Sequence, residues 1–177
     1  SIDTPVSVLL KTRFPVSIQI GLQAFVIGSV VGIVLGVIAA VNRGKFLDTF
    51  ITVLTVLGIS IPSYVFALML SYVFGFKLAW LPMLYRLDSP LESTLLPTIA
   101  LALGPIAVIC RFTRTEMVEV LNSDYILFAQ SKGILRRSLL FRHALRNALI
   151  PVITIFGPMF VGMMMGSLVV EQIFSVP

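Results

Sequence analysis

Four long stretches without a charged residue run through the chain, and they constrain its fold more than any other feature. They cover residues 14–42, 49–76, 93–110 and 147–170, with lengths of 29, 28, 18 and 24 residues. A membrane-spanning helix needs about 20 mostly apolar residues. The third stretch reaches that length if its helix continues beyond Arg111. The sequence therefore predicts four spans, at about 14–42, 49–76, 93–114 and 147–170.

The composition excludes an ordinary soluble protein. Hydrophobic residues make up 58% of the 177 residues, charged residues make up 12%, and the mean hydropathy is +1.03. Soluble domains carry about 25% charged residues, and disordered chains combine high charge with low hydrophobicity. We therefore expect an all-α integral membrane protein, a polytopic helical bundle whose surroundings are the lipid bilayer. No nucleic-acid motif accompanies the net charge of +5, so nucleic acid is not expected as a partner.

Lysine and arginine are divided unequally between the two sides that four alternating spans create. Nine lie in the connections 43–48 and 111–146, and four lie on the opposite side. Because connections rich in lysine and arginine stay in the cytoplasm, the loop 115–146 is predicted to be cytoplasmic and residue 1 external. The chain starts without methionine and stops a few residues after its last span, so we expect it to be the middle of a longer protein.

Glycines recur every fourth residue in the first and the last predicted span. They are Gly28, Gly32 and Gly36 in the first span and Gly162 and Gly166 in the last. Residues four apart share one helix face, and glycines on that face let another helix approach closely. We expect these glycines to serve helix packing within the bundle rather than a dedicated dimer face.

The sequence lacks the residue groups that catalysis or metal binding requires. Cys110 and His143 are the only cysteine and histidine, and all eight acidic residues lie outside the four uncharged stretches. Gly44-Lys45 is the nearest match to a phosphate-binding loop, but Phe46 replaces the required Ser or Thr. We expect no catalytic residue, no metal site and no bound cofactor, so energy for any work would come from a partner.

The predicted cytoplasmic loop contains a short helix with an apolar surface. The polar residues 122–124 suit a helix start, and Gly133 suits the left-handed position that follows a helix end. The helix between them, over 125–132, is expected to expose four apolar side chains, which a cytoplasmic loop does not leave uncovered. These are Tyr125, Ile126, Leu127 and Phe128. The helix either lies on the membrane surface or docks onto a soluble partner.

This loop resembles the signature loop of ABC-importer permeases, and more narrowly that of the oligopeptide/dipeptide/nickel permease family. The matching residues are 124–126, 129–133 and 142–151, which read DYI, AQSKG and RHALRNALIP. Further matches, in the family's order, include SIP at 60–62, WLP at 80–82 and Glu171 near the end. The chain departs from the family pattern, which has Arg, Thr and Ala, at Leu127, Phe128 and Ser131.

The resemblance implies a coupling helix that docks into a groove on a cytoplasmic ATPase subunit. Closure of the ATPase pair on ATP then drives the permease between inward- and outward-facing states. Ala129 would pack closely against the ATPase, and Gly133 would provide the turn. The residues implied at this interface are Asp124, Tyr125, Ile126, Leu127, Phe128, Ala129, Gln130, Ser131, Lys132 and Gly133. ATP and magnesium would be used by the partner subunits and not bound by this chain.

The resemblance also implies the surroundings of the chain. A full subunit would be one ABC-importer transmembrane domain of six spans, of which this chain holds the second to the fifth. It would be the first of two permease subunits, which pair as a heterodimer in a bacterial or archaeal cytoplasmic (inner) membrane. Two cytoplasmic ABC ATPase subunits and an external substrate-binding protein would complete an importer of di- and oligopeptides, coupled through the loop 122–138.

Two other function classes remain open on the residues alone. A secondary carrier or channel needs no ATPase but uses ionisable groups at depth, and a membrane scaffold would bind a partner without ATP dependence. The sequence does not assign a substrate path, because polar residues inside the spans serve equally as path lining or as helix contacts. These residues are Gln19, Gln23, Ser60, Ser63 and Thr154.

Overall fold

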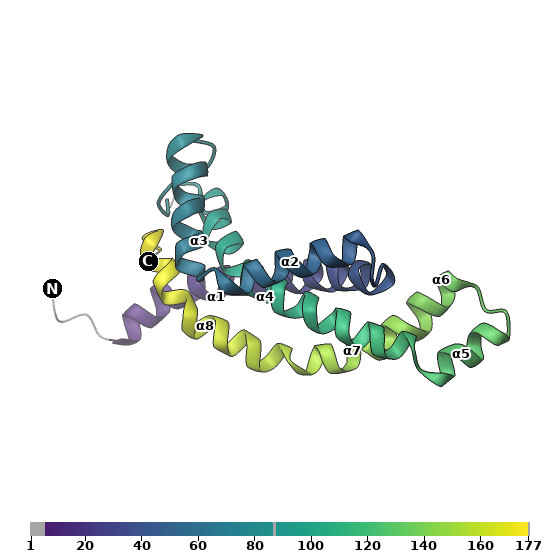
Figure 1. Cartoon of the computed structure of the whole chain (residues 1–177). Helices are drawn as coiled ribbons and strands as arrows, with labels where there is room; N and C mark the ends of the chain where they lie inside the picture. Colours follow the sequence, from purple (N-terminus) through teal and green to yellow (C-terminus); the bar gives the residue numbers. More distant parts are fainter. Residues whose placement is uncertain (1–5, 87, 177) are drawn as a thin grey trace. The chain divides into compact units, whose positions relative to one another are not determined.

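The computed structural model describes the backbone of residues 6–86 and 88–176 and the side chains of residues 15–86 and 88–176. These residues form helices joined by turns, without a strand among them (Figure 1). The predicted all-α fold is therefore confirmed. Residue 1, which the charge distribution places outside the membrane, lies outside the described residues, as do the side chains of Lys11 and Arg13.

The helical segments follow one another along the chain with short connections. They are α1 (Val6–Val41), α2 (Phe46–Ser60), α3 (Ser63–Leu70), the π-helical η1 (Ser71–Lys77), α4 (Pro90–Leu121), α5 (Asp124–Ser131), α6 (Arg136–Ser138), the π-helical η2 (Leu139–Ala144), α7 (Leu145–Thr154) and α8 (Phe156–Ile173). The helix of the third predicted span continues beyond Arg111 as expected, because α4 ends at Leu121.

Three of the described helices are long and apolar enough to cross a membrane. They are α1 from Pro15 onward, α4 and α8. The two parts α2 and α3–η1 pass the same test together, so the described residues hold three helices long and apolar enough to span a membrane, or four such segments if this interrupted pair is one span. The prediction of four spans agrees with the second count, in which α2 and α3–η1 together form one segment.

Prolines interrupt two of the predicted spans but not a third. Pro62 has no N–H to donate to the carbonyl of Gly58, so α2 ends at Ser60. Pro158 likewise has no donor for the carbonyl of Thr154, and the region predicted as the last span consists of α7 and α8 with a turn between them. The helix α4 continues through both of its internal prolines.

The chain divides into two compact units. The first unit comprises the chain up to Ile27, Ile61–Gly104 and the chain from Met159. It holds α3, η1, the first part of α4 and most of α8. Within this unit α1 contacts α8 through the edge-to-face pair Phe25 and Phe160, whose ring centroids lie 5.4 Å apart. Thr98 of α4 donates a hydrogen bond of 3.3 Å to the side-chain oxygen of Gln23 on α1.

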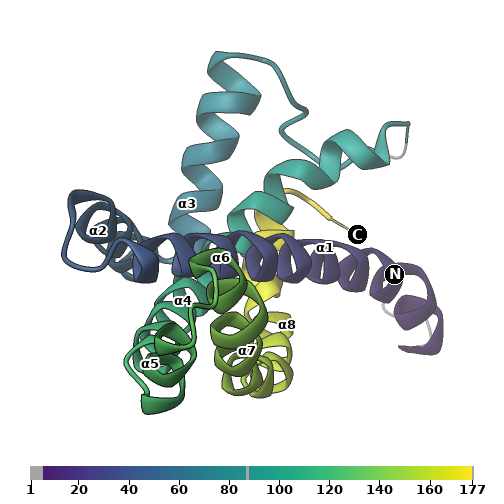
Figure 2. The same ribbon diagram turned by 90° about the vertical axis from the view of Figure 1, so that its right-hand side faces the viewer.

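The second unit comprises Gly28–Ser60 and Pro105–Pro158 and holds α2, the end of α4, and α5 to α7. Figures 1 and 2 show α5 beside the end of α4 and the chain returning through α6 toward α7. A cluster of buried residues, which we call the loop core, joins the ends of these helices to α1. Its members are Ala40, Met117, Ile126, Ala129, Leu139, Ala144 and Ala148. A smaller cluster of Ala39, Ile51 and Cys110 joins α1, α2 and α4.

Candidate functional site

The short helix α5 begins where the polar cluster predicted it. Ser123 occupies the position before the first helical residue, and its carbonyl oxygen accepts hydrogen bonds from the backbone N–H groups of Ile126 and Leu127. Its hydroxyl group does not cap the helix. It donates instead to the carbonyl oxygen of Val120 at 2.6 Å, which ties the start of α5 to the end of α4. Within the polar cluster, Ser123 therefore joins the two helices.

The end of α5 has the geometry of a Schellman motif. Gly133 has a φ of +76°, and its N–H donates to the carbonyl oxygen of Gln130 at 2.9 Å. The N–H of Ile134 donates to the carbonyl oxygen of Ala129 at 3.4 Å, and Ile134 packs against the loop core. This is the bond pattern that ends a helix at a left-handed residue, where glycine avoids the strain that a side chain brings. The predicted turn at Gly133 is confirmed.

One face of α5 is buried in the chain itself. Ile126 is 0% exposed and Ala129 is 9% exposed, and both belong to the loop core with Met117 of α4 and Ala144 of η2. The prediction that Ile126 is exposed is therefore wrong. The reason is that helices far away in the sequence cover this face, which the run of apolar residues in α5 does not indicate by itself.

The opposite face of α5 carries exposed apolar side chains. Leu127 is 54% exposed and Phe128 is 61% exposed, while Tyr125 is partly held by a hydrogen bond of 2.8 Å from the side-chain amide of Asn147 on α7. The ammonium group of Lys132 lies 4.4 Å from the ring centroid of Phe128, in cation–π geometry. The exposed face of α5 is thus a small apolar surface with one adjoining cation.

The segment that returns from α5 also carries exposed apolar side chains. Leu135 and Phe141 are both exposed, and together with Arg137 and Arg142 they line a cavity of about 480 Å³. Residues 134–147 contain four arginines, one histidine and no acidic residue. The cavity is therefore lined by Leu135 and Phe141 and surrounded by positive charge. The sequence analysis did not single out Leu135 or Phe141. Two large apolar residues beside several arginines, in a loop expected to be cytoplasmic, are a pattern that could have indicated this surface.

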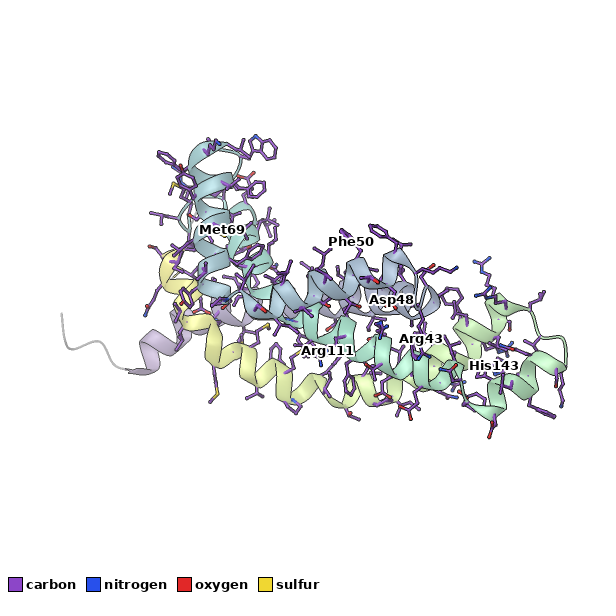
Figure 3. All side chains as sticks on the ribbon, in the orientation of Figure 1. Arg43, Asp48, Phe50, Met69, Arg111 and His143 are labelled. Carbon is purple, nitrogen blue, oxygen red and sulfur yellow. The ribbon has the colours of Figure 1, made fainter. Side chains whose placement is uncertain are left out.

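An ion pair between the buried Asp48 and the partly buried Arg114 connects α2 to α4 within the same unit. Arg114 binds the carboxylate of Asp48 through two N–H groups, with 2.8 Å between Nη2 and Oδ2, and the backbone N–H of Gly44 donates to the same carboxylate at 2.9 Å. In Figure 3 Asp48 lies on the side of α2 that faces α4, and Phe50 lies on the opposite side. Arg114 precedes Met117 of the loop core by one helical turn, so the pair couples α2 to the support of α5.

The glycines predicted for helix packing fall into two groups. Gly28 is buried, and Gly32 and Gly36 lie where α1 contacts α4. A methyl group added to Gly36 would lie 2.6 Å from the carbonyl oxygen of Cys110, too close for any real contact. The same methyl group on Gly162 or Gly166 would meet nothing within 4 Å in the part of the chain that is described. Packing by these two glycines remains a prediction.

Glu171 carries a feature that the sequence did not indicate. It follows the last uncharged stretch directly, yet its side chain on α8 is only 6% exposed. Its Oε2 accepts a hydrogen bond of 2.8 Å from the hydroxyl of Ser17 on α1, whereas the buried Oε1 has no hydrogen-bond partner among the described residues. No local pattern predicts this contact, because the two residues are 154 positions apart.

Three of the polar residues considered for a substrate path make contacts within or between helices. Gln23 accepts the hydrogen bond from Thr98, the hydroxyl of Ser60 donates to the carbonyl oxygen of Val56, and the hydroxyl of Thr154 donates to that of Pro151. Within the described part of the chain, no group of three or more potential metal-binding side chains comes together. The path stays unassigned.

Comparison with known protein families decides what kind of protein has this loop. The family described as the binding-protein-dependent transport system inner membrane component matches residues 32–177, which include α5 and the whole loop core. The chain belongs to this family. The predicted family resemblance is thereby confirmed, and the family together with the apolar helices makes the chain part of a multi-pass membrane protein.

Curated relatives of this family are named as peptide permeases. The chain is 46% identical over 169 residues to the dipeptide transport system permease protein DppB of Bacillus subtilis (strain 168), covering 96% of this chain and 54% of the relative. It is 43% identical over 175 residues to DppB of Lactococcus lactis subsp. cremoris (strain MG1363). It is 41% identical over 175 residues to the oligopeptide transport system permease protein OppB of Salmonella typhimurium. Each of these two matches covers 99% of this chain and 57% of the relative. The chain spans a little over half the length of these relatives.

Proposed function

We propose that this chain belongs to a permease subunit of an ATP-driven ABC importer. The subunit would form half of the translocation path for di- and oligopeptides that an external binding protein delivers. The family supports the transport role, and the names of the DppB and OppB relatives support the peptide substrate. A second permease subunit, two cytoplasmic ATPase subunits and the binding protein would be its partners, and only the ATPases would bind ATP and magnesium.

The observation that carries the proposal is the two-sided helix α5. Leu127 and Phe128 are exposed apolar residues on one face, and Ile126 and Ala129 fix the other face to the loop core. An ATPase subunit that covers the exposed face removes apolar surface from water. Movement of that subunit would then reach α1, α4 and α7 through the loop core. We infer that Ile126 and Ala129 support the coupling loop 122–138 from behind.

The orientation follows from the distribution of lysine and arginine. We propose spans at about 14–42, 49–76, 93–114 and 147–170 in a bacterial or archaeal inner membrane, with residue 1 outside and 115–146 in the cytoplasm. This orientation brings α5 to the side where ATP is available.

The test measures ATP-driven peptide uptake in vesicles that contain the full-length subunit with its partners. In Gly133→Arg the backbone of a residue with a side chain must adopt the left-handed conformation, which costs about 1–3 kcal/mol and distorts the end of α5. We therefore expect uptake to fall by about tenfold or more. The matched control is Gly133→Asn, because asparagine adopts positive φ far more readily and should keep most of the uptake. Normal uptake by Gly133→Arg at an equal amount of subunit in the membrane would overturn the coupling role.

A further inference from the structure

A cavity between α2 and α4 in the second unit has a chemical character that peptide transport does not explain. It has a volume of about 310 Å³, about ten times the share of one water molecule in liquid water. Ile51, Val56 and Cys110 give it apolar walls. Thr52, Arg111 and Arg114 add polar groups from the two helices. The cavity therefore combines hydrocarbon with positive charge.

Two residues that line this cavity, Arg111 and Thr52, have side-chain donors without a hydrogen-bond partner among the described residues. Asp48 already binds Arg114, whereas Arg111 is exposed and has no carboxylate partner within the described residues. The hydroxyl groups of Thr55 and Thr115 donate to backbone carbonyl oxygens of their own helices. Of the three threonine hydroxyl groups that line the cavity, only that of Thr52 makes no hydrogen bond among the described residues. A guanidinium and a hydroxyl thus offer donors for an anion.

The cavity lies beside one boundary of each of two uncharged stretches of the chain. Ile51 and Thr52 are close to the start of the uncharged stretch at Thr49, and Arg111 is the first charge after the stretch that ends at Cys110. In the orientation given under the proposed function, both ends face the cytoplasmic surface of the membrane. Headgroups of the cytoplasmic leaflet lie at this level, and basic pockets between helices bind them.

We infer that this cavity binds an anionic phospholipid of the cytoplasmic leaflet. The phosphate accepts hydrogen bonds from the guanidinium of Arg111 and the hydroxyl of Thr52, and an acyl chain lies against Val56. An amphiphile fits better than free phosphate, because the walls are apolar and the bilayer holds the ligand at the mouth of the site. Since Asp48 neutralises Arg114, Arg111 supplies the charge that selects an anionic lipid over a zwitterionic one.

The test titrates the purified full-length subunit, together with its partners, with phosphatidylglycerol or phosphatidylcholine and counts bound lipid by native mass spectrometry. In Arg111→Gln the apparent affinity for phosphatidylglycerol should fall about fivefold, the effect of about one lysine or arginine at a membrane surface. Thr52→Val should give a smaller loss, and binding of phosphatidylcholine should not change. The matched control is Arg136→Gln, which removes an exposed arginine that does not line the cavity.

Four results would overturn the inference. They are unchanged phosphatidylglycerol binding in Arg111→Gln, an equal loss in Arg136→Gln, displacement of the lipid by millimolar inorganic phosphate, and loss of a protein partner from Arg111→Gln with no change in bound lipid. The first two exclude a specific lipid site, the third indicates a soluble anion, and the fourth indicates a protein contact. ATP-driven uptake is measured separately on the same samples, so that failure of the lipid site and failure of the permease role are distinguishable.

Discussion

Gly32 with Gly36 and Gly162 with Gly166 are two glycine pairs with the same spacing and different surroundings. On α1, Gly32 and Gly36 lie against the backbone of α4, where even one added methyl group has no room. On α8, the same spacing faces open space in the part of the chain that the structure describes. The pattern alone predicts a small-residue face, and only the neighbouring helix decides whether that face is filled.

The same contrast between a filled and an open face recurs in α5. Ile126 is fully buried, and the next residue, Leu127, is half exposed, although both are large aliphatic side chains. In this account the filled faces hold each unit together and the open faces are where partners bind. Substitutions on matched positions of the two kinds can break or sharpen this distinction.

The largest expected effect is that of Gly36→Leu. A leucine at this position pushes α1 away from Cys110 and Thr113, and such overpacking costs about 3 kcal/mol or more. The melting temperature of the purified full-length subunit should fall by at least about 6 °C. Gly162→Leu is the matched control and should leave the melting temperature within about 2 °C of the parent. Equal shifts for the two variants would show that the filled and open faces do not differ.

The next effect separates the two faces of α5. Ile126→Ala removes buried methyl groups from the loop core and should cost about 2–5 kcal/mol of unfolding free energy. Leu127→Ala should change that free energy by less than about 0.5 kcal/mol, yet weaken the association with ATPase subunits. Thermal unfolding and co-purification, measured on both variants, check the two statements. If Leu127→Ala destabilises the subunit as much as Ile126→Ala, then the exposed face of α5 belongs to the core.

A smaller effect is expected from the ion pair that joins α2 to α4. Asp48→Asn removes a charged acceptor of three hydrogen bonds and leaves Arg114 partly buried without its partner, at a cost of about 1–3 kcal/mol. Asp88→Asn, a change at an exposed carboxylate of the first unit, should have no measurable effect on stability.

The effects of Asp48→Asn and Arg114→Gln should not add in the double variant, since either change breaks the same contact. Additive losses in unfolding free energy would contradict a direct interaction between the two side chains.

The sequence predicted features whose cause is local. The turn at Gly133 follows from the need for a positive φ after a helix, and the extension of α4 beyond Arg111 follows from the thickness of a bilayer.

Features that depend on distant segments were beyond sequence reasoning. The side of α5 that is buried is chosen by residues of α1, α4 and η2, and the apolar run 125–128 offers no polar contrast from which to choose a face. The burial of Glu171 depends on Ser17, at the other end of the chain. The pairing of Asp48 with Arg114 could not be predicted either, because a count of lysine and arginine includes Arg114 without showing which carboxylate lies beside it.

The measurement that tests the central claim most directly is co-purification of ATPase subunits with the full-length permease subunit carrying Phe128→Glu. A carboxylate at this exposed position of α5 opposes burial of the apolar face against a partner. Leu91→Glu is the control, because Leu91 is an apolar residue at the start of α4 that is at least as exposed as Phe128, on the predicted external side. The account predicts that ATPase subunits are lost from Phe128→Glu and retained by Leu91→Glu. Retention of the ATPases by both variants, with ATP-driven uptake unchanged, would contradict it.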